Sequence, residues 1–311
     1  MELTGLHHVS AITGNAVKNL DFYTRTLGLR LVKKTVNQDD VSSYHFFYGD
    51  AVGSPGTEVT FFDWAGARAN RPGAGAISTI ALSVDGSEAV QWWADRLARA
   101  DIPAGSIYDD NGNPSFDFKD PEGQSLRIVG EPASGIPWKE SPVPEPYGII
   151  GMHHVTLTVL QLSSISRVLV DVLGFRLSDE LLQNGKPVHV FETGQGGAGK
   201  HVRVVETDEL GRVVLGAGGV HHVAFRTPNV REQTEWLSII QSAGLHVSSI
   251  IDRYYFQSIY FREQGGILFE IATDGPGFAS DEDPDHLGER LALPPFLEPR
   301  RKEIEAGLVP V

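Results

Sequence analysis

The chain of 311 residues contains no cysteine, which excludes disulfide bonds, thiolate metal ligands and cysteine nucleophiles. It also has no excess of basic residues, because it contains 26 lysines and arginines and 40 aspartates and glutamates. Its formal net charge is −14. Nucleic acid and anionic membranes are therefore poor partners. No apolar run approaches the roughly 20 residues of a membrane span, and the first residues show no charged flank before an apolar stretch. These absences predict a cytoplasmic enzyme or binding protein.

A phrase that the sequence does contain, and contains three times, is His-His-Val. The pairs are His7-His8, His153-His154 and His221-His222, and each opens a short β-like run. Because side chains alternate between the two faces of a strand, we expect the histidines of each pair to point in opposite directions. A histidine at one place of a repeated unit suggests a metal site built from duplicated modules.

The chain is predicted to contain four modules, each with a strand, a helix and three strands, of roughly 55–60 residues by apolar periodicity. The expected helices span 16–27, 88–100, 162–173 and 230–243. Modules one and two are expected within 1–132, a Pro-rich linker over 133–147, modules three and four within 148–275, and a tail over 276–311. In the tail, the acidic run 281–285 is predicted to be a solvated loop and the apolar run 291–297 to dock on the body.

Equivalent positions on the first and last strands of each module should lie side by side on one face. They give four pairs, namely His8 with Thr60, Thr79 with Arg127, His154 with Arg203, and His222 with Glu270. Arginine offers no lone pair to a metal, and Glu270 is the only carboxylate among these positions. We therefore predict that the fourth module supplies His222 and Glu270, and that His8 or His154 supplies the second imidazole.

Two imidazoles and one carboxylate on one face form the facial triad of non-haem Fe(II) oxygenases, and zinc also accepts such ligands. The other histidines on strands or at the surface carry no repeat signal, and we predict no metal-binding role for them. They are His45, His189, His201 and His246.

The chain resembles the vicinal oxygen chelate superfamily of glyoxalases, bleomycin resistance proteins and extradiol dioxygenases, and within it the hydroquinone ring-cleaving dioxygenases. The resemblance covers nearly the whole chain. It is carried by LHHVSAITGNAVKNLDFYTRTLGLRLVKKT, SYHFFYGDAVGSPGTEVTFF, GVHHVAFRTPN, DRYYFQSIYFREQGGILFEIATDGPGF and DEDPDHLG. It implies an α+β fold in which four βαβββ modules form two pseudo-symmetric domains with cupped mixed β-sheets.

The resemblance also implies a site. Fe(II) would be held by His8, His222 and Glu270, with Mn(II) or Zn(II) as less suitable metals. Thr60 stands where many members carry a fourth ligand. His154 is a departure from the hydroquinone branch, and its equivalent is a ligand in extradiol catechol dioxygenases, so it stays the alternative third ligand. The residues implied around the substrate are His7, Ser10, His221, Arg253 and Tyr260, of which Ser10 replaces a usual threonine.

The function implied by the resemblance is cleavage of a substituted hydroquinone next to a ring hydroxyl, with both atoms of dioxygen inserted. The partners would be a small aromatic substrate and dioxygen, and we expect a homo-oligomer with no nucleic-acid or membrane partner. The alternatives are an extradiol catechol dioxygenase, a glyoxalase-like metal-dependent isomerase or lyase, and a small-molecule binding or resistance protein.

Overall fold

The computed structural model describes residues 1–183 and 185–311, and it contains four modules of the predicted kind. The first module consists of β1 (Leu6–Thr13), α1 (Ala16–Asp21), η1 (Phe22–Thr26), β2 (Arg30–Asn37), β3 (Asp40–Gly49) and β4 (Glu58–Asp63). The second consists of β5 (Ala76–Ser83), α2 (Gly86–Arg99), β6 (Tyr108–Asp110), β7 (Asn113–Lys119) and β8 (Ser125–Val129).

The second half of the chain repeats this order after the short helix η2 (Glu145–Tyr147) of the linker. The third module consists of β9 (Met152–Val159), α3 (Leu162–Arg167), η3 (Val168–Val172), β10 (Arg176–Gln183), β11 (Lys186–Glu192) and β12 (His201–Glu206). The fourth consists of β13 (Gly219–Thr227), α4 (Val230–Ser242), β14 (Ile251–Asp252), β15 (Gln257–Arg262) and β16 (Leu268–Thr273). The tail contains η4 (Phe278–Ser280), η5 (Pro284–His286), η6 (Glu298–Arg300) and α5 (Arg301–Gly307).

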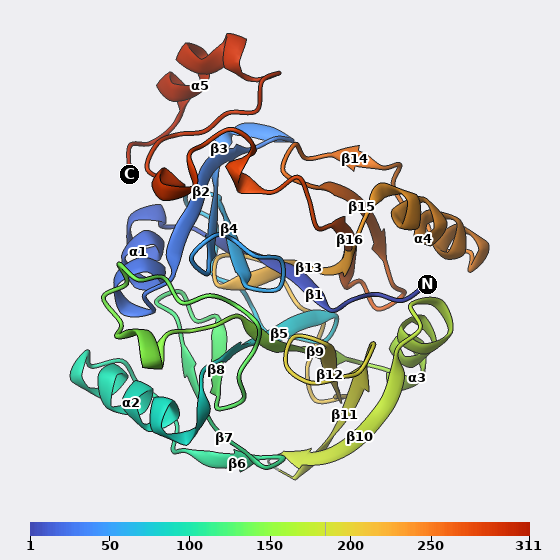
Figure 1. Cartoon of the computed structure of the whole chain (residues 1–311). Coiled ribbons are helices and arrows are strands. Elements are labelled where there is room, and N and C mark those ends of the chain that lie inside the picture. Colours follow the sequence, from blue (N-terminus) through green and yellow to red (C-terminus); the bar gives the residue numbers. More distant parts are fainter. Residues whose placement is uncertain (184) are drawn as a thin grey trace.

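The modules form two curled, mixed sheets of eight strands, which confirms the predicted fold class (Figure 1). One sheet has the order β14-β15-β16-β13-β1-β4-β3-β2, and the other has the order β10-β11-β12-β9-β5-β8-β7-β6. In every module the first and last strands pair in parallel, as predicted. The first module thus shares a sheet with the fourth, and the second with the third. The predicted division of the chain into two domains at the linker remains a proposal. Each sheet contains one module from before the linker and one from after it.

Each sheet has an apolar face covered by helices and a more polar inner face. On β1, Val9 and Ala11 are fully buried in the main apolar core, which also contains Phe22 and Tyr23 from the helical segment of the module. Burial of one such large side chain stabilises the fold by roughly 1.5–3 kcal/mol. Over the described ranges, no helix combines the length and the apolar character that crossing a membrane would require.

The helix predicted over 16–27 changes its hydrogen-bond pattern half way. It is α-helical over α1 and continues as the π-helical turn η1, where the Leu27 amide donates to the Phe22 carbonyl at 2.9 Å. Gly28 then adopts a φ of 69°, a left-handed conformation that glycine reaches without steric cost. The helix predicted over 162–173 divides in the same way. Apolar periodicity therefore located both helices but did not reveal their change of pitch.

The tail packs against the first module through a buried lysine, so the prediction of a solvated loop over 281–285 is wrong for its first two residues. Lys33 on β2 is fully buried. Its ammonium group donates to Asp281 at 2.7 Å and to the Phe278 carbonyl at 3.0 Å, and it pairs with Glu282. The predicted docking of 291–297 is confirmed, because the Ala292 amide donates to a carbonyl of β2.

Replacing Lys33 by methionine is expected to lower the free energy of unfolding by about 3–5 kcal/mol, because it leaves buried carboxylates without their cation. The tail should also become sensitive to proteolysis. Urea denaturation and limited proteolysis measure the two effects. Lys34→Met is the matched control on the same strand, and equal stability of the two variants would contradict the role assigned to Lys33.

Candidate metal centre

Each of the three His-His pairs lies at a β-bulge, where one strand carries an extra residue. In the register of the antiparallel pairs β1–β13 and β5–β9, the residues skipped are His7, His153 and His221. Within each pair the two Nδ1 atoms are only 2.7 to 2.9 Å apart. The prediction that the paired histidines point in opposite directions is therefore wrong, because a bulge interrupts the alternation of faces.

The first pair forms a hydrogen-bond chain that ends at a backbone carbonyl. His7 Nε2 lies 3.1 Å from the Thr273 carbonyl oxygen, which can only accept, so we assign the proton to this nitrogen. His7 Nδ1 is then an acceptor, and His8 Nδ1–H donates to it across 2.9 Å. His8 Nε2 keeps a free lone pair, which is the form in which an imidazole binds a metal.

Three potential ligand atoms from the first and fourth modules converge at one point. His8 Nε2 and His222 Nε2 lie 3.2 and 2.9 Å from Glu270 Oε2, and the two nitrogens are 3.3 Å apart. All three side chains are buried. Glu270 Oε2 receives no hydrogen bond from the described residues, while the Ser258 hydroxyl donates to the other carboxylate oxygen. A buried, unbonded carboxylate oxygen between two imidazole nitrogens fits a metal ion that binds all three.

The electrostatics of the cluster suit a metal. Burial alone raises the pKa of a carboxyl, but His8 and His222 outweigh it and hold the pKa of Glu270 well below its usual range. Burial is also the main cause that lowers the pKa of His222, although Glu270 opposes this shift. A low pKa for the carboxyl of Glu270 and a lowered pKa for His222 favour the deprotonated forms that metal binding requires.

A cavity adjoins His8 and His222, and five aromatic residues contribute to its wall. The aromatic residues that line it are Phe47, Phe62, Tyr255, Phe256 and Tyr260. The Arg253 guanidinium donates to the Tyr260 hydroxyl at 3.3 Å and pairs with Asp39 at 2.9 Å. Ser10, Arg253 and Tyr260 thus line the cavity, as the resemblance implied. His7 and His221 instead contact His8 and His222 and are not part of its wall.

Comparison with protein families matches residues 5–128 and 151–271 to the Glyoxalase/Bleomycin resistance protein/Dioxygenase superfamily. The chain belongs to this superfamily. The resemblance that the sequence motifs carried is thereby confirmed.

Relatives within the superfamily align with nearly the full chain. "Putative ring-cleaving dioxygenase MhqA" of Bacillus subtilis is 44% identical, and the alignment covers 100% of both chains. "Chlorohydroquinone/hydroquinone 1,2-dioxygenase" of Sphingobium indicum is 31% identical, with 96% of this chain and 94% of the relative covered. A crystal structure described as a "putative dioxygenase" from B. subtilis has 38% identity and a TM-score of 0.91, covering 99% of this chain and 97% of that one. Glyoxalase I of Zea mays, at 14% identity and a TM-score of 0.64 over 87% and 92% of the chains, shares the fold alone.

In this superfamily member, His154 lies apart from the three converging residues. It is on β9 in the second sheet, where it clusters with His153 and His201. The structure therefore brings His8, and not His154, together with His222 and Glu270. The sequence could not decide between these histidines, because the choice depends on which modules share a sheet.

The structure places two residues at the site that sequence reasoning missed. His45 lines the cavity, and its Nε2 lies 2.9 Å from Thr60 Oγ1, which is 2.7 Å from Ser10 Oγ. The Thr60 hydroxyl is thus engaged by polar side chains. Glu58 lies with His7 and His8 in another buried cluster, but burial raises its pKa well above the usual range, which makes it a poor ligand. A lone histidine and a strand-initial glutamate gave no repeat signal.

Proposed function

We propose that the chain is a non-haem Fe(II) ring-cleaving dioxygenase that opens substituted hydroquinones next to a ring hydroxyl, with both atoms of dioxygen entering the product. The convergence of His8, His222 and Glu270 beside an aromatic cavity carries this proposal. Relatives named as ring-cleaving dioxygenases support an oxygenase, and one of them is named for chlorohydroquinone and hydroquinone. A small aromatic substrate and dioxygen would be the partners of a cytoplasmic homo-oligomer.

The donor set favours Fe(II) over Mn(II) or Zn(II), because two imidazoles and one carboxylate on one face leave positions open for substrate and dioxygen. Fe(II) bound there would lower the pKa of a coordinating phenol and supply electrons for dioxygen activation. Thr60 offers no charge to the metal, and its hydroxyl is held by Ser10 and His45. The coordination sphere therefore stays open.

His7 and His221 act in this proposal as positioning residues. Burial, together with the adjacent His8 or His222, lowers the pKa of each to about 3. Both rings are neutral near pH 7, so neither changes charge in the working range. His7 accepts a hydrogen bond from His8 Nδ1, and His221 Nδ1 is hydrogen-bonded to His222 Nδ1, so each would orient the neighbouring ligand.

Tyr260, Arg253 and Ser10 supply polar groups to the cavity. Burial raises the pKa of Tyr260, so its hydroxyl remains a donor near neutral pH. The Arg253 guanidinium donates to the Tyr260 oxygen, which leaves the hydroxyl proton free for an oxygen of the substrate. A donor and a cation in a water-poor cavity stabilise developing negative charge on the ring oxygens.

Tyr260→Phe is expected to lower kcat by about 10²–10³-fold, as removal of one oxyanion donor does in other enzymes. Iron content should be unchanged, because the tyrosine is not among the three ligands. Steady-state dioxygen uptake with metal analysis checks both statements. Tyr254→Phe, in the loop that precedes β15, is the control, and a wild-type kcat for Tyr260→Phe would refute the role of this hydroxyl.

The proposed function is tested by loading the protein with Fe(II) under anaerobic conditions and measuring dioxygen uptake with methylhydroquinone, chlorohydroquinone and catechol. We expect one dioxygen consumed per hydroquinone. Uptake with catechol alone would favour an extradiol enzyme. Full occupancy by zinc or nickel, without uptake after Fe(II) addition, would favour a glyoxalase-like isomerase or lyase. Ligand binding without any turnover would identify a binding protein.

A further inference from the structure

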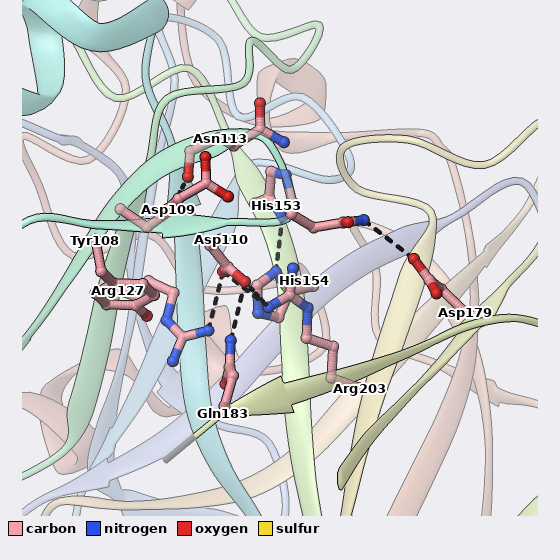
Figure 2. A network of polar contacts seen from close by, with 12 residues as sticks. Tyr108, Asp109, Asp110, Asn113, Arg127, His153, His154, Asp179, Gln183 and Arg203 are labelled. Atoms are coloured by element: carbon pink, nitrogen blue, oxygen red, sulfur yellow. Dashed lines mark hydrogen bonds and ion pairs between the residues drawn. The ribbon is translucent and has the colours of Figure 1, made fainter. Parts of the chain in front are cut away.

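The second sheet contains a cluster of buried histidines that the proposed reaction does not use, and Figure 2 shows two of them, His153 and His154. His154 on β9 and His201 on β12 are register partners on neighbouring strands, and His153 adjoins both. The three rings have centroid separations of 4.8 to 4.9 Å, and all three residues are at least 95% buried. One potential ligand atom of each lies within 4.8 Å of the others.

The bulged pair in this cluster repeats the hydrogen-bond chain of the first module. His153 Nε2 lies 2.8 Å from a Glu131 carboxylate oxygen, so this nitrogen carries the proton. His153 Nδ1 then accepts from His154 Nδ1–H across 2.7 Å. His154 Nε2 is left with a free lone pair, as is the Nε2 of His8 in the first sheet.

The second imidazole is oriented independently. His201 Nδ1 lies 3.1 Å from the Gly197 carbonyl oxygen and must donate to it, which leaves His201 Nε2 unprotonated. Neither His154 Nε2 nor His201 Nε2 has a hydrogen-bond partner in the part of the chain that the structure describes, and both atoms are buried. A buried acceptor without a partner destabilises the fold. These two acceptors lie on adjacent strands, and a separate hydrogen bond orients each of them. One cation bound to both nitrogens would satisfy both.

We propose that His154 and His201 bind a second metal ion through their Nε2 atoms, with His153 and Glu131 orienting His154. Imidazoles without a carboxylate suit Zn(II), Cu(II) or Ni(II) better than the iron of the first sheet. Two nitrogens on one tetrahedral zinc lie about 3.4 Å apart, so a small shift of the two rings would accompany binding.

The charges around the cluster are compatible with a cation. Arg203 occupies the register position that holds the carboxylate in the fourth module, but Asp110 accepts from it at 2.7 and 2.8 Å (Figure 2). Arg127 is held by Asp110 at 3.1 Å and by Asp117 at 2.7 Å. Together with the carboxylate of Glu131, those of Asp110 and Asp117 outnumber the two guanidinium groups near the cluster. The arginine also removes the carboxylate that a facial triad would need, so the two sites would differ in metal.

The test is the stoichiometry of Zn(II) bound to the chelator-treated full chain, measured by equilibrium dialysis and metal analysis. We expect two zinc ions per wild-type chain, one at each site. His154→Gln and His201→Gln should each bind one, and so should His222→Gln at the other site. His189→Gln on the neighbouring strand β11 is the matched control and should bind two.

A gentler variant separates ligand loss from misfolding. Glu131→Gln leaves both proposed ligands in place and should weaken zinc binding at the second site by about tenfold or more, because it removes the group that orients His153. Dioxygen uptake by the iron-loaded His201→Gln protein should be unchanged. One zinc per wild-type chain, or two that persist in both His154→Gln and His201→Gln, would overturn the second site without bearing on the first.

Discussion

Replacement of His8 by alanine is expected to remove both the iron and the dioxygen uptake of the protein, whereas His154→Ala should retain both. His8 Nε2 lies within 3.3 Å of both Glu270 Oε2 and His222 Nε2, while His154 belongs to the other sheet. Loss of one of three ligands removes several kcal/mol of metal binding and transition-state stabilisation, which corresponds to at least about a 10³-fold fall in kcat/KM.

The measurement is iron per chain after anaerobic loading with Fe(II) and gel filtration, followed by dioxygen uptake with a hydroquinone. His8→Ala and His154→Ala are matched controls for each other, because each removes one buried imidazole from a bulged pair. Equal retention of iron by the two variants would show that His8 is not a ligand. Loss of iron from His154→Ala but not from His8→Ala would instead support His154 as the third ligand, as in extradiol catechol dioxygenases.

The metal-free protein is expected to unfold cooperatively as the pH falls from about 6 to 5. Burial is the largest cause that lowers the pKa of each of seven histidines below the usual 6.5. They are His7, His45, His153, His154, His201, His221 and His222. Below pH 6.5 the unfolded chain binds protons that the folded chain excludes, so the stability present above that pH is lost on acidification.

Each excluded proton lowers the free energy of unfolding by more than about 1 kcal/mol per pH unit. Seven such groups therefore consume a typical stability of about 5–15 kcal/mol within one or two pH units. Urea denaturation in the presence of a chelator, at several pH values between 7.5 and 5, measures this slope. A free energy of unfolding that stays constant over that range would refute the neutral, buried state of these histidines.

The sequence was sufficient to predict the modules and most of the candidate centre. Apolar periodicity located the helices, and the repeated His-His-Val phrase aligned three of the four first strands. Matching positions on the first and last strands then singled out Glu270, although the register in the structure is offset by two residues and places Glu58 opposite His8. These inferences succeed because strand and helix periods are local properties of the chain.

The features that the sequence did not predict depend either on contacts between distant segments or on local irregularities of the strands. The choice of His8 over His154 follows from the pairing of β1 with β13, which no local pattern encodes. Lys33 meets Asp281 across 248 residues, so its strand looked like an ordinary amphipathic one. The bulges that turn each histidine pair to one side add one residue to a strand, and this insertion leaves the apolar pattern almost unchanged.

The sharing of one sheet by the first and last modules has a consequence for biosynthesis. His8 and His222 are 214 residues apart, and Glu270 follows later still. Because domains fold progressively from the N-terminus as the ribosome advances, a nascent chain carries His8 long before its partners exist. The three residues of the proposed metal site therefore cannot converge on an unfinished polypeptide. The proposed site would become able to bind a metal only after the fourth module has been synthesised.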